Sequence, residues 1–206
     1  SSSALSGRLP ELLADYVALY PEVKLDIREM TGVATLTALE DAQVDLAICA
    51  DNYDYSRFEI EIFEDDDIWV IASPSHELAA AMSAGEKITF EKAAAHEVVG
   101  VHHTGALDRL INDAARRAGR VLGERVKVET FPALVRMVEA GFGIGFIRNC
   151  SIHLLAGTDL VQAPLAEPWA ERKLLLARRK STPLATSVTA FLAMARDTYR
   201  PGERQH

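Results

Sequence analysis

The sequence predicts an α/β protein of two lobes, each with strands and helices in alternation. An order of helix, strand, helix, strand opens the chain, and a second such series follows it. Two segments interrupt the pattern, the acidic run Glu64–Asp67 and residues 163–170, which contain two prolines. We interpret them as crossings between lobes, so lobe I is expected to comprise residues 1–66 and 168–206, and lobe II residues 67–167.

The first series begins close to the N-terminus. Apolar residues at helical spacing predict a helix over 8–20, which Pro21 ends. Apolar and charged residues alternate over 23–27, as they do in a half-buried strand. A second helix is expected over 33–39 and a short apolar strand over 44–48. This order favours a largely parallel sheet with helices on both faces.

The second series follows two strands that flank the acidic run within residues 58–72. It predicts a short alanine-rich helix after Pro74, and then, in order, a strand over 97–101, a helix over 107–118, a strand over 126–128, a helix over 131–140, a strand ending at 147, a short helix over 150–155 and a strand over 160–162. The return to lobe I gives a strand over 173–177 and a final helix over 188–199. Gly119 and Gly141 follow helices and suit a left-handed cap.

Composition and charge restrict the class of protein. With 206 residues, 49% hydrophobic and 25% charged, the chain has the composition of a soluble globular protein and not of a disordered or fibrous one. The net charge is 22 minus 30, or -8, which is the wrong sign for neutralising phosphates, so we expect the chain alone not to bind DNA. It shows no apolar run of membrane-span length and no signal peptide, which predicts a cytoplasmic location and no membrane partner.

Cysteine and histidine usage gives no sign of a metal or cofactor. Cys49 and Cys150 are far apart in sequence and lack CxxC spacing, so we expect two buried thiols, with one disulfide between them as the alternative. Six histidines occur without an HExxH motif. The acidic run lacks the spacing of a calcium loop and is interpreted as a solvated turn. We therefore expect no metal site and no cofactor.

Two short segments are candidates for binding an anion. His102, His103 and Thr104 follow a predicted strand and open a predicted helix, where unpaired N–H groups favour a carboxylate; a solvated loop is the alternative. Arg148 and Asn149 follow a buried strand, and a guanidinium can bind a carboxylate through two parallel hydrogen bonds. The alternative for Arg148 is a surface ion pair.

Catalytic motifs are lacking in the sequence. The glycines of GFGIG (141–145) precede a strand and are not followed by Lys-Ser or Lys-Thr, so they are interpreted as turn and packing residues and not as a phosphate loop. There is no GxSxG nucleophile motif. Two lobes with helix N-termini and no catalytic constellation favour a binding protein over an enzyme.

Four segments in order resemble one known family. They are LPELLADYVALYPEVKL (9–25), AQVDLAI (42–48), IASPSHEL (71–78) and MVEAGFGI (137–144). Together they resemble the effector-binding, or substrate-binding, domain of LysR-type transcriptional regulators, over nearly the whole chain. The resemblance implies two Rossmann-like lobes similar to type 2 periplasmic binding proteins, with a ligand cleft between them.

The resemblance also implies partners, and the chain departs from the family at several points. A complete member carries an N-terminal helix-turn-helix domain, absent from this chain, through which a homodimer or homotetramer binds promoter DNA. The family's first strand is missing here, and residues 1–7 match the loop that follows it. Arg148 stands where the family usually has proline, which points either to an acidic effector or to an outward-facing side chain.

By this resemblance a small organic anion would be the effector, bound by residues of both lobes. The expected contacts are Ser2, Ser3, Thr31, Gly32, His102, His103, Thr104, Phe131, Arg148 and Asn149. Two other classes stay open. A solute-binding protein of a transporter shares the fold but needs an export signal, and an enzyme on this scaffold needs an acid/base pair in the cleft.

Overall fold

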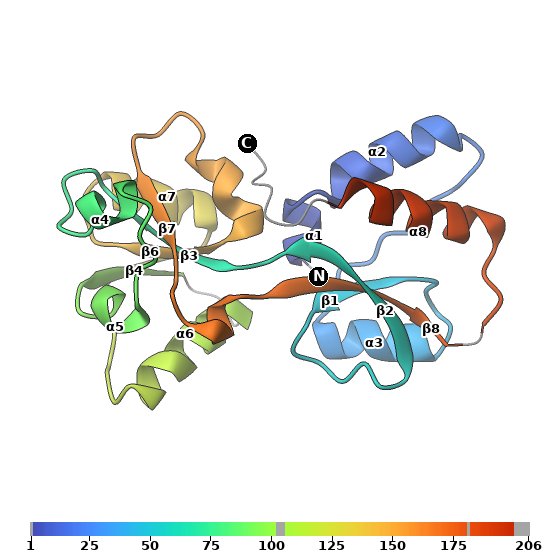
Figure 1. The fold of residues 1–206 in the computed structure, drawn as a ribbon, viewed down its shortest axis with the longest axis horizontal. Coiled ribbons are helices and arrows are strands. Elements are labelled where there is room, and N and C mark those ends of the chain that lie inside the picture. Colours follow the sequence, from blue (N-terminus) through green and yellow to red (C-terminus); the bar gives the residue numbers. More distant parts are fainter. Residues whose placement is uncertain (1, 102–105, 181, 200–206) are drawn as a thin grey trace. The chain divides into compact units, whose positions relative to one another are not determined.

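The structure is a computed structural model that describes residues 2–101, 106–180 and 182–199 (Figure 1). The chain divides into two compact units. Unit 1 runs up to Asp66 and resumes at Arg172, and unit 2 runs from Asp67 to Glu171. The chain therefore passes from unit 1 to unit 2 once and returns once, and each unit is described below by itself.

Unit 1 is a three-stranded sheet covered by helices on both faces. Its elements are α1 (Ser2–Ser6), α2 (Leu9–Leu19), α3 (Gly32–Glu40), β1 (Ala47–Ala50), β2 (Phe58–Asp65), β8 (Lys173–Arg179) and α8 (Thr186–Thr198). The strand order is β1-β8-β2, and both pairings are antiparallel. Figure 1 shows α2 and α8 next to each other on one side of this sheet and α3 on the other.

Alternate residues of the strands supply the two cores of unit 1. Leu174 and Leu176 pack with Leu12, Tyr16 and residues of α8 in one apolar cluster. The other face contributes a second cluster, which contains Ala47, Cys49, Phe58 and Ala177 with Leu36 and Leu39 of α3. The period-2 alternation of a strand therefore divides the apolar side chains between the helices on the two faces.

Two expectations for unit 1 are wrong. Residues 23–27 form no strand, although their alternation predicts one, because in the part of the chain that is described they join no backbone ladder. The seven residues expected as a loop instead begin with the short helix α1, and the N–H of Gly7 donates to the carbonyl oxygen of Ser3 at 3.0 Å. Alternation alone does not supply the partner that a strand needs.

Unit 2 contains the remaining elements. They are β3 (Ile68–Ala72), α4 (Ala79–Ser83), α5 (Phe90–Ala93), β4 (Glu97–Val101), α6 (Ala106–Arg117), β5 (Gly123–Val128), α7 (Phe131–Glu139), β6 (Gly145–Arg148), the 3-10 helix η1 (Asn149–Leu155), β7 (Val161–Pro164) and the 3-10 helix η2 (Pro168–Ala170). The second predicted series is confirmed with shifted bounds, and α5 was not expected.

The centre of unit 2 is β3, whose five residues are all buried. It pairs antiparallel with β6 and with β7. Ile68, Val70 and Ala72 face the cluster that contains residues of α4, α5 and α6, whereas Trp69 and Ile71 face α7 and η1. A strand covered on both faces reads as a continuous apolar run, which is why the segment IWVIA shows no alternation.

Gly143 allows β4 to join this sheet. The N–H of Ile144 donates to the carbonyl oxygen of Glu97 at 2.9 Å, and the N–H of Val99 donates to that of Ile144 at 2.8 Å. A Cβ on Gly143 would lie 2.2 Å from the Glu97 carbonyl oxygen, and its φ of 142° also disfavours other residues. The glycines of GFGIG are therefore turn and packing residues, and Gly119 and Gly141 adopt positive φ as expected.

The expectation of a largely parallel sheet is wrong for the described strands. Only β4 and β5 form a parallel pair of strands, with two isolated parallel bridges beside them. The antiparallel pairs include the strands next to the two passages between units: β2 leads out toward β3, and β7 leads back toward β8. Strands that carry the chain out and back pair naturally in opposite directions.

The acidic run is also not a solvated turn. Glu64 and Asp66 are buried, Asp66 with 0% exposure. The N–H of Asp66 donates to the Arg172 carbonyl oxygen at 2.9 Å, and Asp65 pairs with Lys173 and accepts a hydrogen bond from Tyr199 at 2.9 Å. Because β2 and β8 pair at this point, Lys173 of β8 and Tyr199, which follows α8, lie close enough to compensate the charge of Asp65.

Candidate functional site

In unit 1 the candidate site is the N-terminus of α3. Thr31 has an extended backbone there, with φ -65° and ψ 153°, and its side chain makes no capping hydrogen bond. Its carbonyl oxygen accepts the Thr35 N–H at 2.8 Å and the Thr35 hydroxyl at 2.9 Å. The first N–H groups of a helix have no partner within the helix, and the helix dipole is positive at this end. The end of α3 is therefore suited to a carboxylate.

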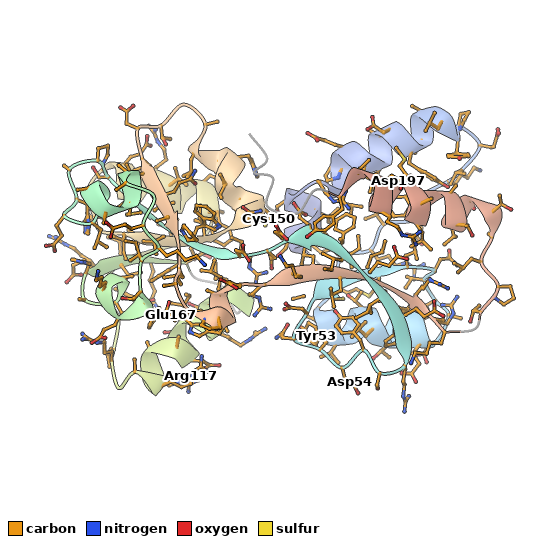
Figure 2. The ribbon with its side chains drawn as sticks, viewed as in Figure 1. Tyr53, Asp54, Arg117, Cys150, Glu167 and Asp197 are labelled. Carbon is orange, nitrogen blue, oxygen red and sulfur yellow. The ribbon has the colours of Figure 1, made fainter. Side chains whose placement is uncertain are left out.

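Tyr53 lies against the same helix end and was not identified from the sequence. A Cβ on Gly32 would be 2.3 Å from Cζ of Tyr53, so a larger residue at position 32 would have to displace the ring. Figure 2 labels Tyr53 in unit 1, beside α3. The signal that could have found Tyr53 is its place: it follows β1 at its carboxyl end, the edge where α/β sheets commonly bind ligands.

The turn that carries Tyr53 is fixed to β8. The N–H of Asp51 donates to the Lys173 carbonyl oxygen at 3.0 Å, and an Asp51 carboxylate oxygen accepts the Lys173 N–H at 3.0 Å. Arg172 donates to the amide oxygen of Asn52 at 3.0 Å. These three hydrogen bonds fix the backbone of the loop directly ahead of Tyr53.

No strong nucleophile lies at this helix end among the described groups. The Cys49 thiol is 3.9 Å from the Gly32 carbonyl oxygen, and burial raises its pKa, so the sulfur stays protonated. Burial also raises the pKa of Tyr55, whose hydroxyl donates to the Ala50 carbonyl oxygen at 2.6 Å. Because the Cys49 thiol and the Tyr55 hydroxyl are both neutral and hydrogen-bonded, this helix end is better suited to binding a ligand than to nucleophilic catalysis.

The two N-terminal serines lie in α1. Ser3 is half-buried in this helix and its carbonyl oxygen closes the turn to Gly7. Ser2 begins α1. Their expected role as loop residues is thus replaced by a helical one, and any contact of theirs with an effector is a proposal.

In unit 2, Phe131 opens α7. The preceding Thr130 is the N-cap, and its hydroxyl accepts the N–H of Ala133 at 3.3 Å. Pro132 has no N–H to satisfy. Half-buried Phe131 contacts both apolar clusters of the unit. Because its N-terminus is capped, α7 is less suited to an anion than α3.

Arg148 and Asn149 lie where β6 ends. Arg148 is only 8% exposed, so its side chain does not lie on the surface. It lies opposite Ile68 in the β3–β6 register. The N–H of Asn149 donates to the Asp67 carbonyl oxygen at 2.9 Å. The end of β6 is therefore fixed to the segment by which the chain enters unit 2.

Three of the predicted contacts, His102, His103 and Thr104, lie outside the described residues. Within the described ranges no group of three or more His, Cys, Asp or Glu residues could hold a metal ion. Likewise, no helix in the described part of the chain has the length and apolarity to cross a membrane.

Cys49 and Cys150 are buried thiols that no disulfide joins.

The structure thus brings together subsets of the predicted residues. Thr31 and Gly32 share one helix end in unit 1. Arg148 and Asn149 share one strand end in unit 2, and Phe131 opens the helix that packs on that strand. That both sets contact one ligand is a proposal.

Two α/β units, joined by two passages of the chain and with a helix end suited to an anion, define a ligand-binding domain of the two-lobed, periplasmic-binding-protein-like class. Residues 1–200 match the family described as "LysR substrate binding domain". The chain belongs to this family, so its fold class and the resemblance seen in the sequence are confirmed.

Curated relatives are named as transcriptional regulators. The chain is 23% identical over 199 residues to "Uncharacterized HTH-type transcriptional regulator YfeR" of Shigella flexneri, covering 96% of this chain and 63% of the relative. It is 21% identical to "Uncharacterized HTH-type transcriptional regulator YbhD" of Escherichia coli K12, covering 90% and 57%. The chain thus spans less than two thirds of either relative.

Solved structures share the fold at low identity. The effector-binding domain of BenM with its effector benzoate has a TM-score of 0.76 at 17% identity, covering 99% of this chain and 94% of that one. The Synechocystis PCC6803 CcmR regulatory domain in complex with 2-PG has a TM-score of 0.74 at 16% identity, with coverages of 97% and 94%. The effector-binding domain of QuiR with shikimate has a TM-score of 0.64 at 20% identity, with coverages of 91% and 88%.

Proposed function

We propose that this chain is the ligand-sensing domain of a LysR-type transcriptional regulator and that its effector is a small organic anion. The main observation in favour of an anionic effector is the start of α3, where the Thr31 side chain does not cap the first N–H groups of the helix. These groups bind one end of the effector, and Tyr53 limits its size. Arg148 supplies a guanidinium from a buried position.

The remaining predicted residues complete the proposed site. Phe131 covers an aromatic or aliphatic part of the effector, and Asn149 adds a hydrogen bond. The sequence proposal also includes Ser2, Ser3, His102, His103 and Thr104. Benzoate and shikimate, named with two of the similar structures, are carboxylates, which supports an anion as the ligand class.

The proposed regulatory function also requires a DNA-binding domain in a longer protein. The relatives named as helix-turn-helix regulators are longer than this chain, which supports DNA binding through such a domain in a longer protein. The proposal also includes assembly of that protein as a homodimer or homotetramer, located in the cytoplasm. With a net charge of -8 the chain itself would not bind DNA. It acts without a cofactor and catalyses no reaction.

The effector acts by favouring one relative setting of the two lobes. It shifts that equilibrium only as far as its affinities for the two settings differ. In the assembled regulator the favoured setting changes how the subunits engage the promoter. The sensing step is therefore binding, with no bond made or broken.

A ligand screen followed by calorimetry tests this proposal. Thermal shift with benzoate, shikimate and other small carboxylates should give at least one stabilising ligand, since a ligand at 100 times its Kd stabilises by about 2.7 kcal/mol. Arg148→Ala should then weaken binding by about 2–5 kcal/mol, and Arg148→Lys should restore part of it.

Arg117→Ala, at an exposed arginine near the end of α6, is the matched control and should leave affinity unchanged. Circular dichroism of each variant shows that it is folded before binding is compared. Unchanged affinity in both Arg148 variants would remove Arg148 from the site, and a screen of anions without any stabilising ligand would contradict the proposed effector class.

A further inference from the structure

Glu64 of β2 is a buried carboxyl that lies at the start of α2. Its side chain belongs to a residue that is only 5% exposed. Both of its oxygens accept the N–H of Arg8, over 3.3 and 3.4 Å, which are long hydrogen bonds. A Cβ on Gly7 would lie 2.3 Å from its Oε2 atom. The carboxyl therefore packs directly against the turn that joins α1 to α2.

The guanidinium of Arg8 is close to this carboxyl but donates to other groups. Its Nε donates to the Phe63 carbonyl oxygen at 2.8 Å, Nη1 to the Thr198 hydroxyl at 2.9 Å, and Nη2 to the Ala195 carbonyl oxygen at 2.8 Å. Two of these acceptors belong to the last turn of α8, where carbonyl groups lack partners within the helix. Arg8 thus holds the end of α8 beside the start of α2 (Figure 1).

The other charged groups around Glu64 do not supply a cation for it. The charged and titratable groups that surround it are Arg8, Asp65, Asp66, Lys173 and Tyr199. Lys173 pairs with Asp65, and the Tyr199 hydroxyl donates to the same carboxylate. Burial is the main cause that raises the pKa of Glu64 to about 7, while the N–H and the charge of Arg8 oppose it. An ionised Glu64 would therefore need the Arg8 guanidinium.

One guanidinium cannot serve both partners fully. A buried carboxylate without a paired cation is strongly unfavourable, and a guanidinium can bind it through two parallel hydrogen bonds. All three nitrogens of Arg8 already donate, two of them to α8. A bidentate contact with Glu64 therefore requires the side chain to turn and to give up hydrogen bonds to α8.

We propose that Glu64 and Arg8 form a proton-controlled switch at the end of α8. With Glu64 neutral, Arg8 binds the last turn of α8, as in the structure. When Glu64 releases its proton to solvent, the guanidinium turns to the carboxylate and the last turn of α8 loosens. The switch responds to pH and not to an effector, so it goes beyond the proposed sensing function.

Amide hydrogen exchange over residues 195–199 of the whole chain tests this switch. Glu64→Gln keeps an acceptor for the Arg8 N–H but cannot ionise, so it should keep Arg8 on α8. At pH 5 the unchanged chain and the variant should exchange alike. At pH 8 the unchanged chain should exchange at least about fivefold faster in this segment, because the turn opens locally. Comparing two proteins at one pH removes the intrinsic effect of pH on exchange.

Two further variants serve as controls. Glu11→Gln, at an exposed residue of α2, should exchange like the unchanged chain at both pH values. Arg8→Lys should exchange at least about fivefold faster over 195–199 at both pH values, because an ammonium cannot reproduce the three bonds of the guanidinium. Circular dichroism shows that each variant is folded, and the Glu64→Gln comparison does not depend on Arg8→Lys.

Carbon NMR of the Glu64 side-chain carboxyl reports its protonation directly and should show a change between pH 5 and pH 8. A carboxyl that is ionised at both pH values would overturn the proposal. So would one that loses its proton while residues 195–199 exchange equally in the unchanged chain and in Glu64→Gln. Neither result bears on effector binding, which the carboxylate screen tests separately.

Discussion

At the scale of single residues, Gly32 is a position where one methyl group decides the geometry of the candidate site. The ring of Tyr53 lies so close that an added Cβ would be 2.3 Å from its Cζ atom. Tyr53 in turn follows a loop that hydrogen bonds to Arg172 and Lys173 fix. A side chain at position 32 must therefore displace the ring or the start of α3.

Gly32→Ala should destabilise the protein by about 1–3 kcal/mol, the usual cost of overpacking. Adding Tyr53→Ala should recover part of that loss, because it removes the ring that the methyl group meets. Urea unfolding of the two single variants and the double variant measures the coupling. Gly123→Ala, where a Cβ would meet only a flexible Glu97 side chain at 3.3 Å, serves as the control. Additive effects at 32 and 53 would show that the two residues are not in contact.

Glu64 is the residue whose protonation should affect stability near neutral pH. Burial is the main cause that raises the pKa of its carboxyl from 4.5 to about 7, while the N–H and the charge of Arg8 act in the opposite direction. Between these values the folded protein binds a proton that the unfolded chain has released. The free energy of unfolding due to this group is therefore greatest below pH 4.5 and falls as the pH rises to about 7.

Glu64→Gln should remove this pH dependence and raise the free energy of unfolding at pH 8 by about 1–3 kcal/mol relative to the unchanged chain. The amide keeps an oxygen that can accept the Arg8 N–H. Urea unfolding at pH 5 and pH 8 gives the two values, and Glu11→Gln on the exposed side of α2 is the control. If the free energy of unfolding changed with pH equally in the Glu64→Gln variant and the unchanged chain, Glu64 would be ionised over the whole range from pH 5 to pH 8.

At the scale of elements, the two helices of the candidate site begin differently. Thr130 caps α7 through its hydroxyl, whereas the Thr31 side chain makes no capping bond at α3. A capped helix start has one of its N–H groups already satisfied, and an uncapped one keeps these groups for solvent or a ligand. The difference explains why we assign the anion to α3 and an apolar contact to α7.

Replacing each threonine by alanine should separate these roles. Thr130→Ala should cost about 1 kcal/mol of stability, since it removes a cap. Thr31→Ala should change stability by less than about 0.5 kcal/mol, since no capping bond is lost. Thermal unfolding of both variants under one condition gives the comparison, and an equal loss in the two would mean that Thr31 also caps its helix.

At the scale of the whole molecule, the four apolar clusters of the described residues each belong to one unit. Those of unit 1 use only residues before Asp66 or after Arg172, and those of unit 2 lie between Ile68 and Ala170. A unit with its own core can in principle fold alone. Unit 2 is continuous in sequence, whereas unit 1 needs two separate pieces of chain.

Residues 67–171 expressed alone should therefore fold with one cooperative thermal transition. The shorter piece 67–167, which follows the boundary expected from the sequence, should be less stable because it lacks Trp169 and Ala170, both part of the core of unit 2. Circular dichroism against temperature tests both. Equal stability would favour the boundary at 168, and an unfolded longer piece would show that unit 2 depends on unit 1.

The sequence by itself determined the order and type of most elements, because helical and strand periodicity record which side chains face a core. It also determined the family, since four motifs in order identify one fold. It suggested the end of β6 as a place for an effector contact because a clear apolar strand precedes it, whereas the starts of α3 and α7 were proposed as contacts through the resemblance to the family.

Only the tertiary structure decided what depends on partners distant in the sequence. Residues 23–27 alternate like a strand but pair with none in the described structure, and the acidic run is buried because β8 returns beside β2. Tyr53 lies on Gly32 through a loop held by residues about 120 positions away. Strand pairing, burial of charge and close ring contacts are properties of packing, which local periodicity does not encode.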